Sequence, residues 1–184
     1  MRSRLTALAV RALCAAVLLH LPGSAVAKVF YAKDEALHLA FPDAERVEPR
    51  DFFLTAEQRT AIEGLAKSKL DSDLLTIYVG TRAGVVQGYA LLDTHNVRTL
   101  PETFLVVLSP QGAVTATHLL AFYEPLEYSP PDRWLKQFDG ATLNDNLRVG
   151  GGVATISGST LTSEAVTGGV RRALAIYDVL LKGR

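Results

Sequence analysis

The chain has 184 residues, of which 48% are hydrophobic and 21% charged, and its formal net charge at pH 7 is zero. This length and composition predict one globular domain with short appendages, and they exclude a repeat array or a low-complexity protein. No basic patch stands out in the sequence, which argues against nucleic acid as a partner.

Residues 1–27 have the parts of a secretory signal peptide. Three arginines come first, the apolar run ALCAAVLLHL follows, and small residues lead to a cleavage site after Ala27. The apolar run is too short for a comfortable membrane span. We therefore expect an exported protein, periplasmic or at the outer face of the cytoplasmic membrane. An uncleaved N-terminal anchor is the alternative.

Export would leave a chain without thiols, because the only cysteine, Cys14, lies in the leader. The leader holds three of the 19 Lys and Arg residues and none of the 19 Asp and Glu residues, so the other 157 residues carry a net charge of −3. Such a protein cannot form disulfides or use thiolates as nucleophiles or metal ligands. Any redox function would depend on a bound cofactor.

Two helices are predicted after the leader. The segment KDEALHLAF is amphipathic and ends at a proline. The segment TAEQRTAIEGLAKSKL begins with Thr55 as N-cap and has Gln58 at the capping-box position. We assign residues 28–75 to an N-terminal helical segment and residues 76–184 to the domain that follows it.

The middle of the chain is rich in strand patterns. LLTIYVG and VVQGYALLD are joined by TRAG, and TFLVVL and AVTATHLLAF are joined by SPQG, which predicts two antiparallel hairpins. The segment DTHNVRTLPE between the hairpins is polar and irregular and is predicted to be a loop. PDRWLKQF then predicts one or two helical turns.

The last predicted element is a long helix. Its apolar residues recur at helical spacing from Val166 to Leu181. Gly168 and Gly169 each cost about 1 kcal/mol relative to alanine in a helix, so we expect this turn to pack closely on the sheet or on a ligand. The fold class is therefore α+β, with an antiparallel sheet of four or more strands, N-terminal helices and a long C-terminal helix.

A cluster of hydroxyl side chains surrounds Gly158 just before this helix. Its members are Ser157, Ser159, Thr160, Thr162 and Ser163. The N-terminus of a helix offers free N–H groups to a phosphate, and glycine allows backbone to approach a ligand. A Ser/Thr-rich cap explains the cluster equally well, with Thr162 or Ser163 as the N-cap. A serine hydrolase that uses Ser157 or Ser159 is a weaker alternative, because SGS lacks the nucleophile-elbow pattern.

The tetrad SGST, followed by LTSEAV and a long helix, resembles the flavinylation motif of the FMN-binding domain family. That family includes the NqrC and RnfG subunits of ion-pumping redox complexes. Upstream, LSPQGAVTATHLLAFYEPLEY resembles the family's turn and strand, which end in a glutamate near a proline and an aromatic residue, here Glu124 and Tyr128. RWLKQFDG resembles the short helix that follows. The resemblance covers residues 76–181.

The resemblance implies that Thr160 carries FMN through a phosphoester bond, made from FAD by an Mg²⁺-dependent flavin transferase. It implies an exported electron-transfer flavoprotein, a carrier or redox-complex component rather than a stand-alone enzyme. Redox proteins, among them a membrane complex, are the expected partners. The expected cofactor-binding residues are Thr160, Ser157, Gly158, Ser159, Thr162, Glu124, Tyr128, His95 and Leu100, with Tyr123 and Trp134 as further candidates to cover the ring.

Three alternatives stay open at this point. The protein can be an accessory protein that binds a flavin or another ligand without a covalent bond. His95 can serve only to hydrogen-bond its loop, and Trp134 can belong to the core. Two positions depart from the family pattern: Ala154 stands where many members have an acidic residue, six positions before the modified threonine, and Ser159 replaces the commoner alanine.

Overall fold

The computed structural model describes residues 27–183, so the predicted leader lies outside the described residues except for Ala27. The strands are β1 (Lys28–Val29), β2 (Arg46–Phe53), β3 (Leu74–Arg82), β4 (Val85–Asn96), β5 (Pro101–Leu108) and β6 (Val114–Phe122). The helices are α2 (Lys33–Ala40), α3 (Ala56–Ala66), α4 (Asp132–Leu135) and α5 (Thr160–Leu180), with the 3-10 turns η2 (Leu126–Tyr128) and η3 (Lys136–Phe138).

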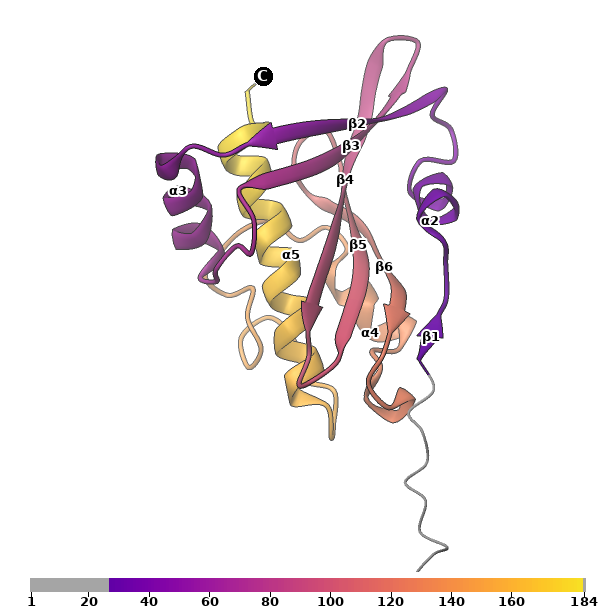
Figure 1. The fold of residues 1–184 in the computed structure, drawn as a ribbon, viewed down its shortest axis with the longest axis vertical. Helices are drawn as coiled ribbons and strands as arrows, with labels where there is room; N and C mark the ends of the chain where they lie inside the picture. Colours follow the sequence, from indigo (N-terminus) through magenta and orange to yellow (C-terminus); the bar gives the residue numbers. More distant parts are fainter. Residues whose placement is uncertain (1–26, 184) are drawn as a thin grey trace, which may run out of the picture.

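The six strands form one antiparallel sheet in the order β1-β6-β5-β4-β3-β2. Helix α5 crosses one face of this sheet with α3 beside it, and α2 lies against the opposite face (Figure 1). The larger apolar core lies between α5 and the sheet, and a smaller one lies beneath α2. The predicted α+β fold with an antiparallel sheet and a long C-terminal helix is confirmed.

The apolar stripe of α5 is buried as its spacing predicts. Val166, Val170 and Leu174 are fully buried and belong to the same core as Phe104 and Val106 of the central strand β5. Each large aliphatic side chain buried in this way contributes about 1.5–3 kcal/mol to stability. The stripe therefore fixes α5 across the sheet and sets the position of its N-terminal end.

The two glycines of α5 differ in their surroundings. A Cβ atom added at Gly169 would lie 2.3 Å from Cζ of Phe104 and 3.0 Å from Cγ of Asp93. A Cβ atom at Gly168 would meet only the Arg172 guanidinium, at an ordinary 3.5 Å. The predicted close packing of this turn on the sheet is therefore confirmed for Gly169.

We expect Gly169→Ala to lower the free energy of unfolding by about 1–3 kcal/mol, because the new methyl group overpacks the contact with Phe104. Gly168→Ala is the matched control, and its higher helix propensity should raise stability by up to about 1 kcal/mol. Urea unfolding of the two variants measures both effects. Equal stability of the two variants would contradict the close contact at Gly169.

Helix α3 begins as the sequence predicts. The Thr55 hydroxyl accepts a hydrogen bond from the Gln58 N–H at 3.2 Å, and the Gln58 side chain accepts one from the Thr55 N–H at 2.9 Å. This reciprocal capping box satisfies two N–H groups that the helix leaves free. Among residues 27–183, no helix combines the length and apolar character needed to span a membrane.

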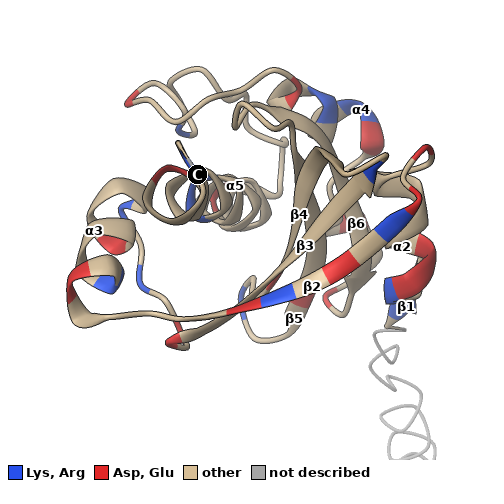
Figure 2. Ribbon diagram, turned by 90° about the horizontal axis from the view of Figure 1, so that it is seen from above, with Lys and Arg blue, Asp and Glu red and all other residues tan. Residues whose placement is uncertain are grey.

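The sequence analysis missed two strands in the segment 28–75. Strand β2 pairs with β3 along its whole length, so this segment joins the same sheet as the domain that follows it. Charged residues recur along β2, which forms the outer edge of the sheet (Figure 2). Pro49 and these charges hide the strand signal, because prolines and charges are typical of protected edge strands.

The predicted loop DTHNVRTLPE is shorter than expected. Strand β4 continues to Asn96 and β5 begins at Pro101, so His95 is a strand residue and the loop prediction is wrong for it. His95 pairs with Glu102 across the two strands, and Thr94 pairs with Thr103. Polar residues face polar residues here, so the usual alternation of apolar and polar positions is missing.

Candidate functional site

The N-terminus of α5 presents the hydroxyl of Thr160. The helix begins at Thr160, with Ser159 as N-cap, and Gly158 turns the chain in the left-handed conformation at φ = 80°. Thr160 is exposed, whereas Ser159 is buried. The N–H groups of Thr160, Leu161 and Thr162 have no hydrogen-bond acceptor among the described residues. They form the positive end of the helix dipole beside the Thr160 hydroxyl.

Thr162 and Ser163 hold this end of the helix in place. The Thr162 hydroxyl donates to the Tyr128 carbonyl at 2.9 Å. The Ser163 hydroxyl donates to the Ser159 carbonyl at 3.0 Å and accepts from the Ile156 N–H at 2.9 Å. The prediction that one of them is the N-cap is wrong, because both lie inside the first turn of the helix. Their hydroxyls connect the motif to η2 and to its own preceding turn.

The segment before the motif is held by the short helical turns of α4 and η3. The indole N–H of Trp134 donates to the Ala154 carbonyl at 2.7 Å, and the Ala154 N–H donates to the Gln137 side-chain oxygen at 2.8 Å. Trp134 is buried and packs edge-on against Phe138, with ring centroids 5.3 Å apart. Trp134 therefore supports the backbone at Ala154 and packs in the core.

Glu124 organises the turn between β4 and β5. Its Oε1 accepts the N–H groups of Thr99 at 2.7 Å, Leu100 at 2.8 Å and Arg98 at 3.3 Å. The side chain is buried. The hydrogen bonds from the Thr99 and Leu100 N–H groups hold the pKa of this carboxyl below its usual value. Glu124 is therefore a fixed, ionised anchor for the turn that carries Leu100.

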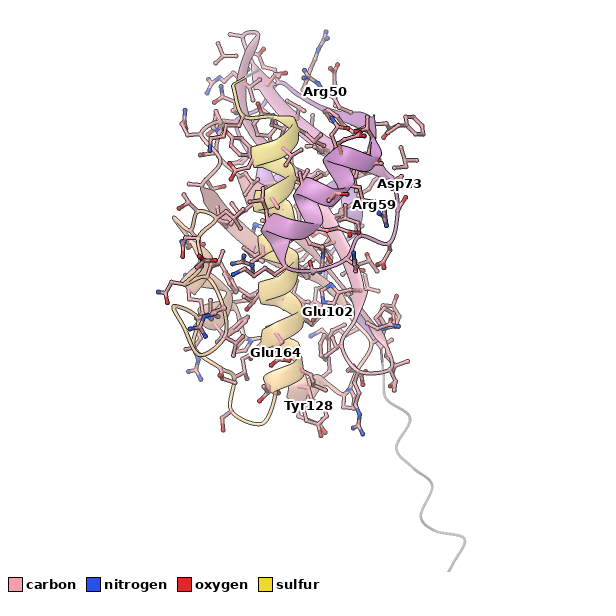
Figure 3. All side chains as sticks on the ribbon, turned by 90° about the vertical axis from the view of Figure 1, so that its left-hand side faces the viewer. Arg50, Arg59, Asp73, Glu102, Tyr128 and Glu164 are labelled. Atoms are coloured by element: carbon pink, nitrogen blue, oxygen red, sulfur yellow. The ribbon has the colours of Figure 1, made fainter. Side chains whose placement is uncertain are left out.

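Four large apolar side chains stay exposed at this end of the molecule. We call them the apolar rim, and they are Leu100, Leu126, Tyr128 and Leu161, each 38–49% exposed. The hydrogen bonds from Glu124 to the Leu100 turn and from Thr162 to Tyr128 connect the segments that carry them. Tyr128 lies beside the first turn of α5 (Figure 3). An apolar surface beside free N–H groups suits a ligand that has a phosphate and a flat ring system.

The sequence analysis named two members of the rim, Leu100 and Tyr128, and missed Leu126 and Leu161. The position of Leu161, directly after Thr160, was the available signal. A leucine that follows the N-terminal residue of a helix and stays outside the buried stripe of α5 must face solvent or a ligand.

His95 lies away from the rim, within a charged cluster between the sheet and α5. Its Nδ1 is 2.7 Å from Asp93 Oδ1 and its Nε2 is 2.7 Å from Glu102 Oε1. Arg172 of α5 binds Asp93 with two nitrogens, at 2.7 and 2.8 Å. We call these four residues the Asp93 cluster. It connects β4, β5 and α5, so the hydrogen-bonding alternative for His95 accounts for its contacts.

The pKa shifts in the Asp93 cluster have opposing causes. Burial alone would lower the pKa of His95, but hydrogen bonds to Asp93 and Glu102 outweigh it and raise that pKa to about 9. Burial would raise the pKa of Asp93, but hydrogen bonds from His95 and Arg172 hold it below its usual value. Burial raises the pKa of Glu102, whose Oε2 has no hydrogen-bond partner among the described residues. His95 is therefore protonated at neutral pH.

We expect His95 to make stability fall as pH rises from 6.5 to about 9.5. Its folded-state pKa lies above the unfolded value of 6.5, so its contribution is complete below pH 6.5 and is lost through pH 9. The loss should be about 2–3 kcal/mol, and His95→Gln should remove it. Urea unfolding at pH 6.5 and 9.5 measures the difference.

His118→Gln is the matched control for this pH experiment. Burial lowers the pKa of His118, so this residue titrates below pH 6.5 and contributes no slope above it. The His118 variant should therefore keep the wild-type fall in stability between pH 6.5 and 9.5. A His95 variant with an unchanged fall would contradict the assignment.

Comparison with known proteins gives one distant relative. No family model matches the chain. The chain is 29% identical, over 162 residues, to a component of the Na⁺-translocating ferredoxin:NAD⁺ oxidoreductase complex of Acetobacterium woodii, its RnfG-type subunit. The alignment covers 82% of this chain and 74% of the relative. This similarity spans most of the chain and supports the resemblance to NqrC- and RnfG-like proteins that the motif indicated.

The structure brings most of the predicted site residues to one end of the molecule. The motif and η2 meet through Thr162 and Tyr128, and Glu124 connects this region to Leu100. His95 is the exception, because its side chain belongs to the Asp93 cluster.

Proposed function

We propose that this protein is an exported electron-transfer flavoprotein that carries FMN on Thr160 through a phosphoester bond. One observation supports this most strongly: the Thr160 hydroxyl is exposed at the first position of a 21-residue helix whose first N–H groups have no partner among the described residues. When bound, FMN supplies one- and two-electron redox chemistry that the side chains of this protein lack.

The residues around Thr160 fit both halves of FMN. The N–H groups of Leu161 and Thr162 and the helix dipole would stabilise a phosphate on the Thr160 oxygen. Gly158 has no atom within 4 Å of an added Cβ position, so the turn leaves room beside the hydroxyl. The apolar rim would contact the ring system. Ser157, which is exposed beside Gly158, is a further candidate for the phosphate oxygens.

Glu124 and His95 would act on the cofactor indirectly. Glu124 orients the turn that carries Leu100, because its carboxylate is already bound to three N–H groups of that turn. His95 holds the ends of β4 and β5 that lead into the same turn. We therefore treat both as positioning residues, and Glu124→Gln should move the flavin spectrum or potential through the position of Leu100.

The distant relative is named as part of an oxidoreductase complex. This supports a role in which the protein passes electrons between redox partner proteins and carries out no substrate chemistry of its own. A flavin transferase would be a second partner, since it attaches the cofactor. Export would place both encounters in the periplasm or at the outer face of the cytoplasmic membrane.

The test is to produce the protein together with a flavin transferase and then denature it. If the proposal is right, yellow colour and flavin fluorescence stay with the protein through denaturing gel filtration, and its intact mass rises by one FMN group. Colour that separates from the protein would favour a non-covalent flavin-binding protein. A protein without flavin that reacts with a serine-directed phosphonate would favour a hydrolase.

A further inference from the structure

The outer edge of β6 is open in its middle. At one end Val114 is paired by the Gly140 N–H and the Ala141 carbonyl, at 2.8 and 2.9 Å. At the other end the Leu120 carbonyl accepts the Phe30 N–H at 2.7 Å, and β1 pairs with the last residues of the strand. Between them, residues 115–119 have no backbone partner on this edge within the described part of the chain. A strand rises about 3.3 Å per residue, so the open edge is about 16 Å long.

This open edge differs from the other edge of the sheet. Strand β2 carries Pro49 and four charged residues, which is how natural proteins protect an edge from pairing. The open segment of β6 has the sequence TATHL, with no proline and no acidic or basic residue besides His118. Its backbone groups can therefore pair with another strand, whereas those of β2 are protected (Figure 2).

A cavity lies against the open edge. It has a volume of about 500 Å³ and lies between Phe30 and Tyr31 on one side and residues 129–139 on the other. We call it the β6 cleft. Its volume is within the range of about 300–1,000 Å³ found for ligand-binding pockets. Unlike the Thr160 site, it is lined by a free length of sheet edge.

The β6 cleft also holds a buried polar group without a partner. Thr117 lines the cleft and is 8% exposed, and its hydroxyl has no hydrogen-bond partner among the described residues. A buried hydroxyl without a partner costs about 1–3 kcal/mol. A ligand that offered a donor or an acceptor here would recover that cost.

The charges around the β6 cleft favour a cationic ligand. Asp132 and Asp139 line it together with a single basic residue, Lys136. His118 also lines it, and burial lowers the pKa of this imidazole, so it adds no positive charge at neutral pH. Both carboxylates act on His118 from the α4 and η3 side, which places them near the open edge.

We propose that the β6 cleft binds an extended protein segment that carries a lysine or arginine side chain, added as a further strand to β6. Main-chain hydrogen bonds to residues 115–119 supply the affinity, as in other cases of strand addition. The basic side chain pairs with Asp132 and Asp139, and a backbone or side-chain group of the segment satisfies the Thr117 hydroxyl. This inference does not depend on the flavin.

The test uses the purified protein and the synthetic peptide acetyl-Thr-Val-Lys-Val-Thr-amide, followed by amide chemical shifts in NMR titrations. The expected result is saturable shifts at residues 115–119 and at Thr117, with little change at Thr160. Asp132→Asn combined with Asp139→Asn should raise the Kd about tenfold. The same peptide with glutamate in place of lysine should bind at least tenfold more weakly.

Two further probes separate strand addition from simple charge attraction. A version of the lysine peptide with methylated backbone nitrogens keeps the charge but loses main-chain donors, and it should not bind. Free lysine amide should not produce the shifts at residues 115–119. Equal binding of either probe, or no saturable shift with the original peptide, would overturn the proposal.

Discussion

Thr160→Ala should abolish the covalent FMN adduct completely. In the proposed attachment the Thr160 oxygen forms a bond to the FMN phosphorus, the bond between the two phosphates of FAD breaks, AMP leaves, and the hydroxyl proton passes to a base of the transferase. Alanine has no oxygen to form that bond. The Thr160 side chain is exposed and makes no hydrogen bond within the described residues, so the helix should keep its structure. Intact mass after production with the transferase measures the loss.

Neighbouring hydroxyls provide matched controls for this experiment. Ser159→Ala should keep the adduct, because the Ser159 side chain is buried and makes no capping hydrogen bond. Thr162→Ala should also keep it, but should lose about 1 kcal/mol of stability with the hydrogen bond to Tyr128. Peptide fragmentation should place the FMN of the wild type on Thr160. Flavin mapped to another hydroxyl, or a fully labelled Thr160→Ala variant, would contradict the assignment.

Ala154 determines how the wild-type result is interpreted. Ala154 is exposed, and its backbone is already held by Trp134 and Gln137. An acidic side chain here would therefore project from a fixed backbone toward a docked transferase. If that enzyme requires the acidic residue, Ala154→Asp should raise the labelled fraction without moving the label from Thr160.

The sequence identified the region of the site but placed the start of the helix two or three residues too late. Five hydroxyl side chains occur within seven residues, and each is a chemically suitable cap. What decides between them is tertiary: Thr162 binds a carbonyl of η2, 34 residues earlier in the chain. Local preferences cannot detect such a contact. The start of the helix at Thr160 strengthens the assignment, because it puts the reactive hydroxyl at the first position of α5.

The same limit explains the prediction about His95. Its polar neighbours in the sequence indicated a loop, although they form the paired ends of β4 and β5. The cluster that makes this pairing favourable includes Arg172, which is 79 residues from its partner Asp93. Glu124 shows the opposite case, because its motif was visible in the sequence. Its role as acceptor for the N–H groups of the Leu100 turn required the fold.

Arg171→Met should cause the largest loss of stability that a single side chain of α5 can produce. Arg171 is 6% exposed, and its guanidinium donates to the Leu65 and Ala66 carbonyls at the end of α3, at 2.8 and 3.1 Å. It also donates to the Asn144 and Leu147 carbonyls, at 2.8 and 3.0 Å. A cation at a helix C-terminus is favoured by the helix dipole. Removing it leaves four carbonyls without this donor.

The expected loss in the free energy of unfolding is about 3–4 kcal/mol, since each buried acceptor left without a donor costs about 1–3 kcal/mol and relaxation recovers part of it. Arg171→Lys should lie between this variant and the wild type, because an ammonium cannot reach all four carbonyls with the geometry of a guanidinium. Arg148→Met, an exposed arginine of the neighbouring loop, should change stability by less than about 0.5 kcal/mol. Hydrogen exchange should show the loss first at the end of α3 and at residues 144–147. A Met variant as stable as the Arg148 control would mean that these carbonyls find other donors, and that α3 and the loop before the motif do not depend on Arg171.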